Sequence, residues 1–542
     1  MGKRKQKKKS ESEDEESKEE KKPKGKNKKN KKGKKEPAVK DVTPVVKVID
    51  KKAIVDQYCP DRQSYHIYQD DENYFNGKFF SCTLNKSDLD KNNNKYYIIQ
   101  LLEHDKDNSL ILFTRWGRVG VPGVHEVKDV DSSSGPKLFM KKYKDKTKGG
   151  YQEIFIDYEA EVKSEDMPKE QKKDKGEKKK IFKNNLSEDV MDLIRLIYNK
   201  KMISDNLHEI GYDSKKMPLG KLSPVTLTNG LNILKEIESE LKSKKPNNAN
   251  LKKLSSDFYT QIPHDFGFQK MSNFIIDTIE KVKEKIDMIS VLSDMKITLK
   301  ILENVENDKE EFENQEEKQL NDSYKQLNCD IRSIDKGEKI YSTLEKYLTA
   351  KIDKEESDNI FYYSRSNKLS LVKAYELNRH GEKDKFKDLG NKKLLWHGSR
   401  MTNFVGILSQ GLRIAPPEAP SSGYLYGKGV YFADMSLKSS FYCYPVNNIA
   451  LILLGEVSLG KEDQRNDTDY CLPKTMKQKT NSVHALGRLV PSEGEYIDKD
   501  VLVPNGNVKY DNNNSVFSDF SEYIVYNVDQ IRLRYLLKIR YN

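Results

Sequence analysis

The chain has 542 residues, of which 97 are Lys or Arg and 85 are Asp or Glu, and its formal net charge is +12. No apolar run reaches about 18 residues, and the lysine-rich start has no apolar core, so we expect neither a transmembrane helix nor a secretory signal. The five cysteines are scattered without a CxxC pair, which supports neither a disulfide framework nor a metal site and fits a reducing compartment.

The first segment in chain order is a basic tail. Residues 1–40 hold 18 Lys and Arg against 8 Asp and Glu, so +10 of the total charge lies there. A segment this charged stays solvated, and we expect residues 1–44 to be disordered. Its composition favours a nuclear-import signal or a phosphate-binding arm, with a plain solubilising tail as the alternative.

Three folded regions follow, separated by charge-rich linkers at 162–180 and 306–325. In region 45–161, "KYYIIQLLE" and "SLILFTRWGRVG" are short runs rich in β-branched and aromatic residues, which predict strands. "PKLFMKKYKDK" after them predicts a short helix. We therefore expect a small β-sheet with one helix.

Region 181–305 is predicted to be all helical. After Ser187, a candidate cap, apolar residues recur at i, i+3, i+4 and i+7 from Val190 to Ile197. The pattern returns after Pro224, and "FIIDTIEKVKEKIDMISVLSDM" predicts another long helix.

Region 326–542 has a mixed pattern, so the fold class expected for the whole chain is α+β and multidomain. Thr402 is a candidate cap for a helix that ends at Gly411. "IALILLGEVSLG" predicts a buried strand, and the alternation of apolar with basic residues over 531–539 predicts a strand with one wet face.

One stretch of this region, "GKGVYFADMSLKSSFYC", suggests the wall of a pocket. Tyr431 points to the opposite strand face from its neighbours, Asp434 is a candidate cap for the next helix, and Ser439 and Tyr442 share a face of that helix. Two tyrosine rings can sandwich a flat ring whose polar edge the serine bonds. Spacing alone also fits an ordinary aromatic core.

A second stretch, "LLWHGSR", is an apolar strand end that breaks into His-Gly-Ser. Gly398 lets a ligand approach the backbone, whose N–H and C=O can hold a carboxamide. His397 alone would more often be a structural hydrogen-bonding residue.

Taken together, these blocks resemble the poly(ADP-ribose) polymerase family. "LLWHGSR", "GLRIAPPEAP", "GYLYGKGVYFADMSLKSSFYC" and "SEYIVYNVDQIRLRYLLK" stand in the order of its catalytic domain. "KKMPLGKLSP" and "FYTQIPHDFGF" resemble the helical regulatory domain of its DNA-dependent members. "YYIIQLLEHDKDN" and "RWGRVG" resemble the domain named after Trp-Gly-Arg. The resemblance implies an ADP-ribosyltransferase that takes NAD+ as substrate and needs no metal.

The resemblance also implies roles for individual residues. The family's His-Tyr-Glu triad falls on His397, Tyr431 and Glu522; His397 would hold the adenosine ribose, and Tyr431 and Tyr442 would stack on the nicotinamide. Gly398 and Ser439 would bind its amide, and Lys438 would stand near the acceptor. The positions expected to hold the adenosine half are Ser399, Asn403, Gly406 and Arg413.

Glu522 has a chemical reason to be there. Cleavage of the nicotinamide–ribose bond builds oxocarbenium character, which a carboxylate on a ribose hydroxyl stabilises. In the family a glutamate here accompanies polymer formation, so we expect polymer. Phe520 and Ser521 depart from the tyrosine-containing version of the motif in some members, which leaves chain length and branching open.

Partners follow from the same resemblance. Trp116 and Arg118 would contact a DNA break, and the helical region would cover the NAD+ cleft until DNA binds. Expected acceptors are histones or other chromatin proteins and the chain itself, including Ser10 and Ser17 of the tail, with an accessory factor directing serine modification. The expected location is the nucleus, in DNA repair or damage signalling, with no membrane partner.

Three other functions are alternatives to polymer formation. A DNA-end-binding scaffold with a dead transferase would be free to lose the triad, which is intact. An NAD-dependent oxidoreductase needs GxGxxG, but Phe432 stands where the third glycine belongs. A single-unit transferase of the same family stays open.

Overall fold

The computed structural model describes residues 54–70, 79–156, 181–199, 201–203, 205, 222–267, 269–306, 312–350, 369–421, 424–492, 494–511 and 515–542. The predicted tail at 1–44 and the predicted linker at 162–180 lie outside these residues. Within the described residues, no helix combines the length and apolar character needed to cross a membrane.

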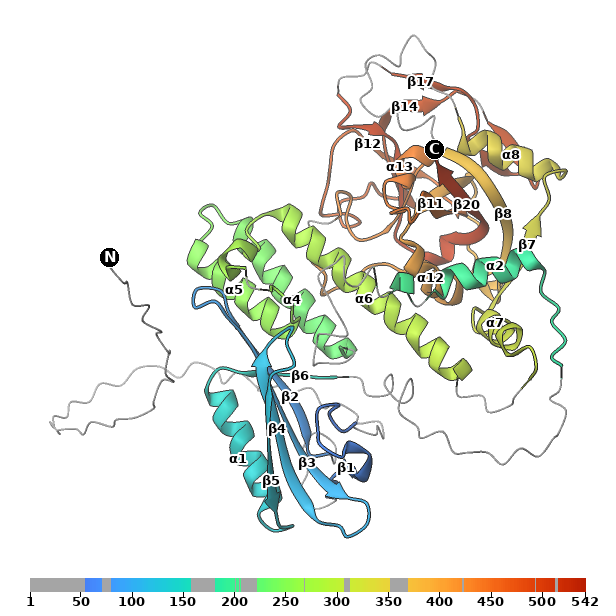
Figure 1. Cartoon of the computed structure of the whole chain (residues 1–542). Coiled ribbons are helices and arrows are strands. Elements are labelled where there is room, and N and C mark those ends of the chain that lie inside the picture. Colours follow the sequence, from blue (N-terminus) through green and yellow to red (C-terminus); the bar gives the residue numbers. More distant parts are fainter. Residues whose placement is uncertain are drawn as a thin grey trace, which may run out of the picture. The chain divides into compact units, whose positions relative to one another are not determined.

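The N-terminal region is a six-stranded antiparallel sheet with one helix, as predicted (Figure 1). The strand order is β5-β4-β3-β2-β6, and β1 pairs with β3. Helix α1 packs on one face through Phe139, which is fully buried against Phe80. The elements are β1 (Tyr65–Ile67), β2 (Ser81–Asp88), β3 (Asn93–His104), β4 (Leu110–Arg118), β5 (Val124–Val130), α1 (Gly135–Lys148) and β6 (Gln152–Ile154), after a short 3-10 turn at Arg62–Ser64.

The helical region was also predicted correctly in type, with differences at its ends. Helix α6 begins at Ile279 rather than within the preceding "FIID", and Ser187 precedes α2 without a side-chain capping bond. Residues 315–325, placed in a linker by their charge, form α7, whose Leu320 is buried. The helices in the described part of this region are α2 (Glu188–Ile197), α4 (Pro224–Leu241), α5 (Asn248–Gln261), α6 (Ile279–Glu306) and α7 (Gln315–Lys325), with a 3-10 turn at Met271–Phe274.

These helices belong to two hydrophobic cores. Helices α4 and α5 and the first part of α6 share a core with Tyr96, Ile98 and Ile154 of the N-terminal sheet. Helices α2 and α7 share the core of the C-terminal region. Ile301 near the end of α6 also belongs to that second core, so α6 takes part in both.

The C-terminal region contains a seven-stranded sheet, in the order β15-β16-β9-β11-β20-β8-β7. Strand β11 is the buried strand expected from its apolar run. The strands of this sheet are β7 (Cys329–Ile334), β8 (Leu369–Arg379), β9 (Lys392–Gly398), β11 (Ile449–Ser458), β15 (Glu495–Ile497), β16 (Val501–Val503) and β20 (Ile531–Tyr541).

The expectation of one wet face on the last strand was correct only in part: Arg540 is exposed and Arg532 and Lys538 are half-buried, but Arg534 and Leu536 are buried. β20 lies between β11 and β8 and is buried along most of its length. Arg534 is only 6% exposed because it pairs with Glu456 at 2.7 Å and Asp498 at 2.6 Å. Carboxylate partners therefore explain the burial of Arg534, while Arg540 at the end of the strand is exposed.

Among the described residues, two smaller sheets and four helices complete this region. The four-stranded sheet has the order β10-β19-β13-β12, with β10 (Val430–Phe432), β12 (Glu462–Arg465), β13 (Ser482–Ala485) and β19 (Glu522–Val525). The three-stranded sheet β17-β14-β18 comprises β14 (Gly487–Pro491), β17 (Val508–Tyr510) and β18 (Ser518–Phe520). The helices are α8 (Lys339–Leu348), α11 (Glu382–Lys385), α12 (Phe404–Gln410) and α13 (Ser436–Ser440), with 3-10 turns at Met401–Asn403 and Val528–Gln530.

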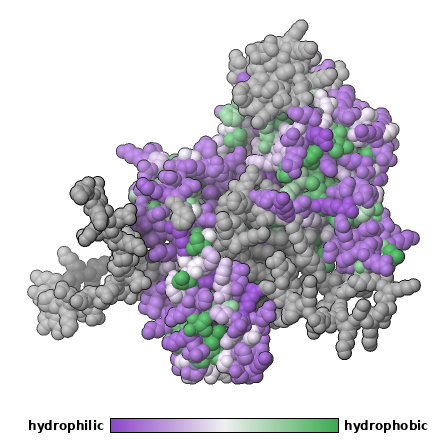
Figure 2. Space-filling view, in the orientation of Figure 1, coloured by the Kyte–Doolittle hydropathy of each residue, from purple (hydrophilic) through white to green (hydrophobic). Residues whose placement is uncertain are grey.

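On the face seen in Figure 2, hydrophilic residues dominate the described surface, and hydrophobic residues gather in small patches. This is the distribution expected for a chain with 34% charged residues.

Candidate active site

The site begins where β9 ends. Trp396 is fully buried and exchanges backbone hydrogen bonds of 2.8 and 3.0 Å with Ala433, which joins β9 to the segment after β10. A Cβ at Gly398 would collide with the carbonyl oxygen of Ser439. Glycine is therefore required for the close approach of β9 to α13.

His397 is held as a neutral ring with one free acceptor. Its Nδ1 donates to the carbonyl oxygen of Tyr431 over 2.9 Å. Burial lowers the pKa of His397. The neutral tautomer with a proton on Nδ1 leaves Nε2 as an acceptor for a ligand hydroxyl.

Tyr431 and Ser439 are fixed by backbone partners. The Tyr431 hydroxyl donates to the carbonyl of Gly427 over 2.7 Å and accepts from the amide of Tyr426 over 3.0 Å. The Ser439 hydroxyl donates to the carbonyl of Trp396 over 3.1 Å. Tyr442 lies two residues after the end of α13 and is 43% exposed.

Glu522 lies on the same face of the four-stranded sheet as Tyr431. Tyr431 pairs directly with Ile524, and Glu522 stands two residues before Ile524 on β19. The Glu522 side chain is 10% exposed and forms an ion pair with Lys438. Burial opposes the charge on Lys438, but the Glu522 carboxylate outweighs it and raises the pKa of Lys438.

The next four predicted residues lie on or beside helix α12, with Gly406 within it. Asn403 donates to the hydroxyl of Ser399 over 3.0 Å. Gly406 faces α6, since a Cβ there would lie 3.4 Å from Oδ1 of Asp294. Arg413 forms an ion pair with the same Asp294. Burial raises the pKa of Asp294 to about 6, against the lowering effect of Arg413.

Two expected helix caps were wrong. Asn403, and not Thr402, is the residue before α12, although the helix ends at Gly411 with the positive φ of 81° that was expected. Met435, and not Asp434, is the residue before α13. In both places the helix starts one residue later than predicted.

The loop after Arg413 is tied to helix α4. Both oxygens of Glu238 accept from Ser421, one from its amide over 2.9 Å and one from its hydroxyl over 3.0 Å. Lys428 donates to the carbonyls of Pro416 and Pro417 over 3.0 and 2.9 Å. The described part of the loop is thus held from the helical region and from β10.

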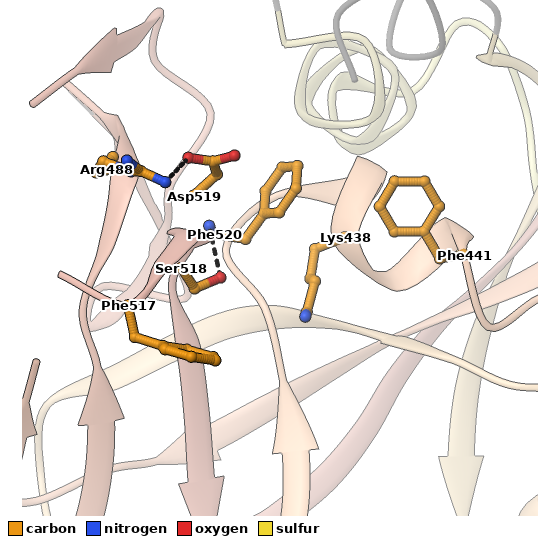
Figure 3. A pocket seen from close by; sticks show the side chains of 7 residues that line it. All are labelled: Lys438, Phe441, Arg488, Phe517, Ser518, Asp519 and Phe520. Carbon is orange, nitrogen blue, oxygen red and sulfur yellow. Dashed lines mark hydrogen bonds and ion pairs between the residues drawn. The ribbon is translucent and has the colours of Figure 1, made fainter. Parts of the chain in front are cut away.

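A groove of about 420 Å³ opens beside Lys438 (Figure 3). Lys438 and Phe441 contribute from α13, while Arg488 and Asp519 form an ion pair of 2.6 Å on the opposite wall. Its remaining lining residues are Phe517, Ser518 and Phe520. The sequence analysis did not identify Arg488 or Phe517, because no motif connects β14 and β18 to α13.

Trp116 and Arg118 lie in the N-terminal region and not at this site. The Trp116 ring stacks on the Tyr97 ring, with the two centroids 5.6 Å apart. The ammonium of Lys146 lies 4.3 Å from the centroid of the Tyr97 ring. Arg118 donates to the carbonyls of Gly267, over 3.2 Å, and Asn92, over 3.1 Å. Arg118 therefore joins the sheet to the helical region.

The structure thus gathers the predicted residues into two groups in the C-terminal region. One group comprises His397, Gly398, Tyr431, Lys438, Ser439, Tyr442 and Glu522. The other comprises Ser399, Asn403, Gly406 and Arg413. Asp294 and Glu238 of the helical region, which contact the second group and its loop, carry no local signal in the sequence.

Comparison with known families assigns all three regions. Residues 341–541 match the poly(ADP-ribose) polymerase catalytic domain, residues 184–324 match the poly(ADP-ribose) polymerase regulatory domain, and residues 80–156 match the WGR domain. The chain is 35% identical over 532 residues to poly(ADP-ribose) polymerase 2 from Homo sapiens, covering 93% of this chain and 86% of that protein.

The chain belongs to the poly(ADP-ribose) polymerase family. It is also 37% identical over 515 residues to poly(ADP-ribose) polymerase 2-A from Oryza sativa subsp. japonica, covering 90% of this chain and 74% of that protein. Against poly(ADP-ribose) polymerase 1 from Xenopus laevis it is 36% identical over 486 residues, which is 86% of this chain and 46% of that protein. The polymerase catalytic match contains both residue groups of the candidate site, and the WGR match contains Trp116 and Arg118.

Proposed function

We propose that this polymerase, when it binds a DNA break, transfers ADP-ribose from NAD+ to proteins and extends it into polymer, releasing nicotinamide. The observation that carries the proposal is the buried Glu522, paired with Lys438 on the sheet face that also bears Tyr431. The matched catalytic domain takes NAD+ as its substrate.

The nicotinamide is proposed to bind between the rings of Tyr431 and Tyr442. The Gly398 backbone offers one donor and one acceptor to the carboxamide, and the Ser439 hydroxyl exchanges its 3.1 Å bond to Trp396 for one to the ligand. His397 accepts a hydroxyl of the adenosine ribose at Nε2. Ser399, Asn403, Gly406 and Arg413 hold the remainder of the adenosine half.

Glu522 is proposed to act on the nicotinamide ribose. As the glycosidic bond breaks, positive character develops on the sugar, and a carboxylate bonded to a ribose hydroxyl stabilises it more in the transition state than in the ground state. During elongation the same carboxylate orients the incoming hydroxyl and takes its proton. Lys438 stays charged and keeps Glu522 in place until the substrate arrives.

The groove beside Lys438 is the proposed path of the acceptor. It is lined by Lys438, which pairs with Glu522, and by Arg488, which pairs with Asp519. An acceptor that carries phosphates would bind there by taking the place of these carboxylate partners. This supports polymer formation over transfer of a single unit, which remains the second candidate.

DNA control is proposed to act through the contacts of the helical region. With Asp294 on Arg413 and Glu238 on Ser421, α6 and α4 restrict the adenosine half. Binding of a break at Trp116 and Arg118 favours a state in which these contacts are released, provided that DNA binds that state more tightly. Deletion of 181–305 would then give activity that no longer needs DNA.

The proposed setting is the nucleus, in DNA repair or damage signalling. Proposed acceptors are histones or other chromatin proteins and the chain itself, with the basic tail as a modified segment and an accessory factor directing serine modification. Polymer on the tail adds negative charge and lowers the affinity for DNA.

The test is incorporation of labelled NAD+ by purified full-length protein, with and without nicked DNA, resolved on a gel. We expect a DNA-dependent ladder that falls by roughly 100-fold or more in Glu522→Gln, since a transition-state charge contact is lost. Trp116→Ala should shift the DNA concentration needed, without shortening the ladder. A single discrete product would establish single-unit transfer, and bound DNA with no product would establish a scaffold.

A further inference from the structure

A row of buried polar side chains lies behind the strand that carries Glu522. Tyr523 follows Glu522 directly and points to the opposite face of β19. There it stands directly opposite Phe432 of β10 and His484 of β13.

Tyr523 is enclosed by polar partners on several sides. Its hydroxyl donates to Oδ2 of Asp434 over 3.2 Å. The His484 ring stacks on it with centroids 4.2 Å apart and planes inclined by 19°. The ammonium of Lys393, from β9, lies 4.6 Å from the centroid of the Tyr523 ring.

The row continues away from Asp434 to a second carboxylate. His484 donates from Nδ1 to Glu462 over 3.0 Å, and Lys393 lies 3.3 Å from the other oxygen of Glu462. Although burial opposes it, these two partners hold the pKa of Glu462 at about 2. Glu462 therefore anchors one end of the row as a fixed charge.

Asp434 at the other end does not cap a helix, although it stands just before one. Helix α13 begins after Met435, and Asp434 is only 4% exposed. A buried carboxylate is costly unless hydrogen bonds satisfy it, so its presence here calls for a role. The turn that it starts leads within four residues to Lys438 and then to Ser439.

We propose that Asp434 and Tyr523 are positioning residues for ADP-ribose transfer. The hydrogen bond between them sets the spacing between the strand that presents Glu522 and the helix that presents Lys438 and Ser439. Without it, Glu522 and Lys438 still attract each other, but the carboxylate is no longer held at the ribose.

The protonation states support this direction of the bond. Burial, followed by the Asp434 charge, raises the pKa of Tyr523 well above its ordinary value, so its hydroxyl remains a donor. Burial raises the pKa of Asp434 to about 6, while His484 and Lys393 oppose the rise. The titratable groups that face Asp434 are Tyr523 of β19, His484 of β13, Lys393 of β9 and Tyr347 of α8. Below about pH 6 Asp434 gains a proton and becomes a weaker acceptor.

The proposal rests on the role proposed for Glu522, so the experiment includes Glu522→Gln. Full-length Tyr523→Phe, Asp434→Asn and the double variant are compared with it for NAD+ turnover and polymer length on nicked DNA. The matched control is Tyr375→Phe, which also removes a buried hydroxyl bonded over 3.0 Å, in this case to the carbonyl of Asp189. Thermal unfolding and DNA affinity verify that each variant is folded.

We expect Tyr523→Phe to lower kcat by about ten-fold and to shorten the polymer, with KM for NAD+ nearly unchanged, since small misplacements at a reacting centre are costly. Asp434→Asn keeps an acceptor and should lose less, and the double variant should fall no further than Tyr523→Phe. The decline of the wild-type rate below about pH 6 should be absent in Asp434→Asn.

The proposal is overturned if Tyr523→Phe behaves like Tyr375→Phe, if the two losses add in the double variant, or if Asp434→Asn keeps the acid limb. If Tyr523→Phe does not fold, the pH profile of Asp434→Asn decides alone. A Glu522→Gln variant that still makes polymer would instead overturn the proposed role of Glu522.

Discussion

The nicotinamide and adenosine halves of the proposed NAD+ site differ in what holds them. The residues of the nicotinamide half contact one another within the C-terminal region, as in the ion pair of Lys438 with Glu522 and the contact of Lys438 with the Tyr442 ring. The adenosine half is contacted from outside, by Asp294 of α6 and, through its loop, by Glu238 of α4.

This difference separates the groups that act on the glycosidic bond from the contacts that limit the binding of NAD+. A change in α4 or α6 can alter how NAD+ binds without moving Glu522. Control of this kind should appear mainly in KM for NAD+ and in the dependence on DNA, while kcat at saturating NAD+ and DNA stays nearly constant. Four changes test the comparison.

The largest effect is expected for Gly398→Ala in the nicotinamide half. A Cβ there collides with the Ser439 carbonyl and pushes β9 away from α13, so turnover should fall by about 100-fold. The measurement is NAD+ turnover at saturating nicked DNA, with DNA affinity as a check on folding. Gly337→Ala, where a Cβ meets nothing within 4 Å, is the control. Retained activity in Gly398→Ala would contradict the close approach.

Asp294→Asn tests the adenosine half. Loss of the ion pair with Arg413 should raise activity without DNA by about five-fold, because the covered state is less favoured. Activity with saturating DNA should change little. Asp277→Asn is the control, since its ion pair with Lys281 is exposed. Equal DNA-independent rates in Asp294→Asn and Asp277→Asn would show that Asp294 does not take part in the regulation by DNA.

A smaller effect is expected for Glu238→Gln. The amide keeps one acceptor for Ser421 but loses the charge, so the loop is held less firmly. We expect about a two-fold lower KM for NAD+ in the absence of DNA. An unchanged KM would mean that the loop is not restricted by α4.

The smallest effect is a pH dependence of control. Asp294 has a pKa of about 6, raised by burial, so its charge is present above that pH and is lost as the pH falls through it. The ion pair with Arg413 weakens accordingly, and the ratio of DNA-independent to DNA-stimulated activity should rise below about pH 6. The ratio cancels the loss of rate expected from Asp434. In Asp294→Asn the ratio should not vary over this range.

Much of the site could be predicted because its determinants are local. The alternation around Tyr431 and the glycine after His397 follow from strand geometry. The helix face expected to carry Ser439 and Tyr442 was wrong, because α13 ends at Ser440 and Tyr442 follows it. The motif order then joined them to Glu522 through the family resemblance.

The rest depends on contacts between residues far apart in the chain. Nothing near Asp294 or Glu238 indicates that they contact Arg413 and Ser421, which stand more than one hundred residues later. The sequence favours Asp434 as a helix cap, because an aspartate just before a helix commonly has that role. In the structure its carboxylate accepts a hydrogen bond from the Tyr523 hydroxyl instead. The wet face expected for β20 failed at Arg534 for the same reason, since Glu456 and Asp498 pair with it.

The rotational phase of helix α6 determines which of its side chains face each of the two cores that it joins. Its 28 residues form an unbroken helix of about 42 Å, with Ile286 and Ile289 in the core shared with the N-terminal sheet and Ile301 in the other core. Each residue advances the helix by about 100°, so a single insertion between Ile289 and Asp294 would turn everything after it away from its partners. The chain can therefore vary the composition of this helix, but not its length between the two cores, without disconnecting them.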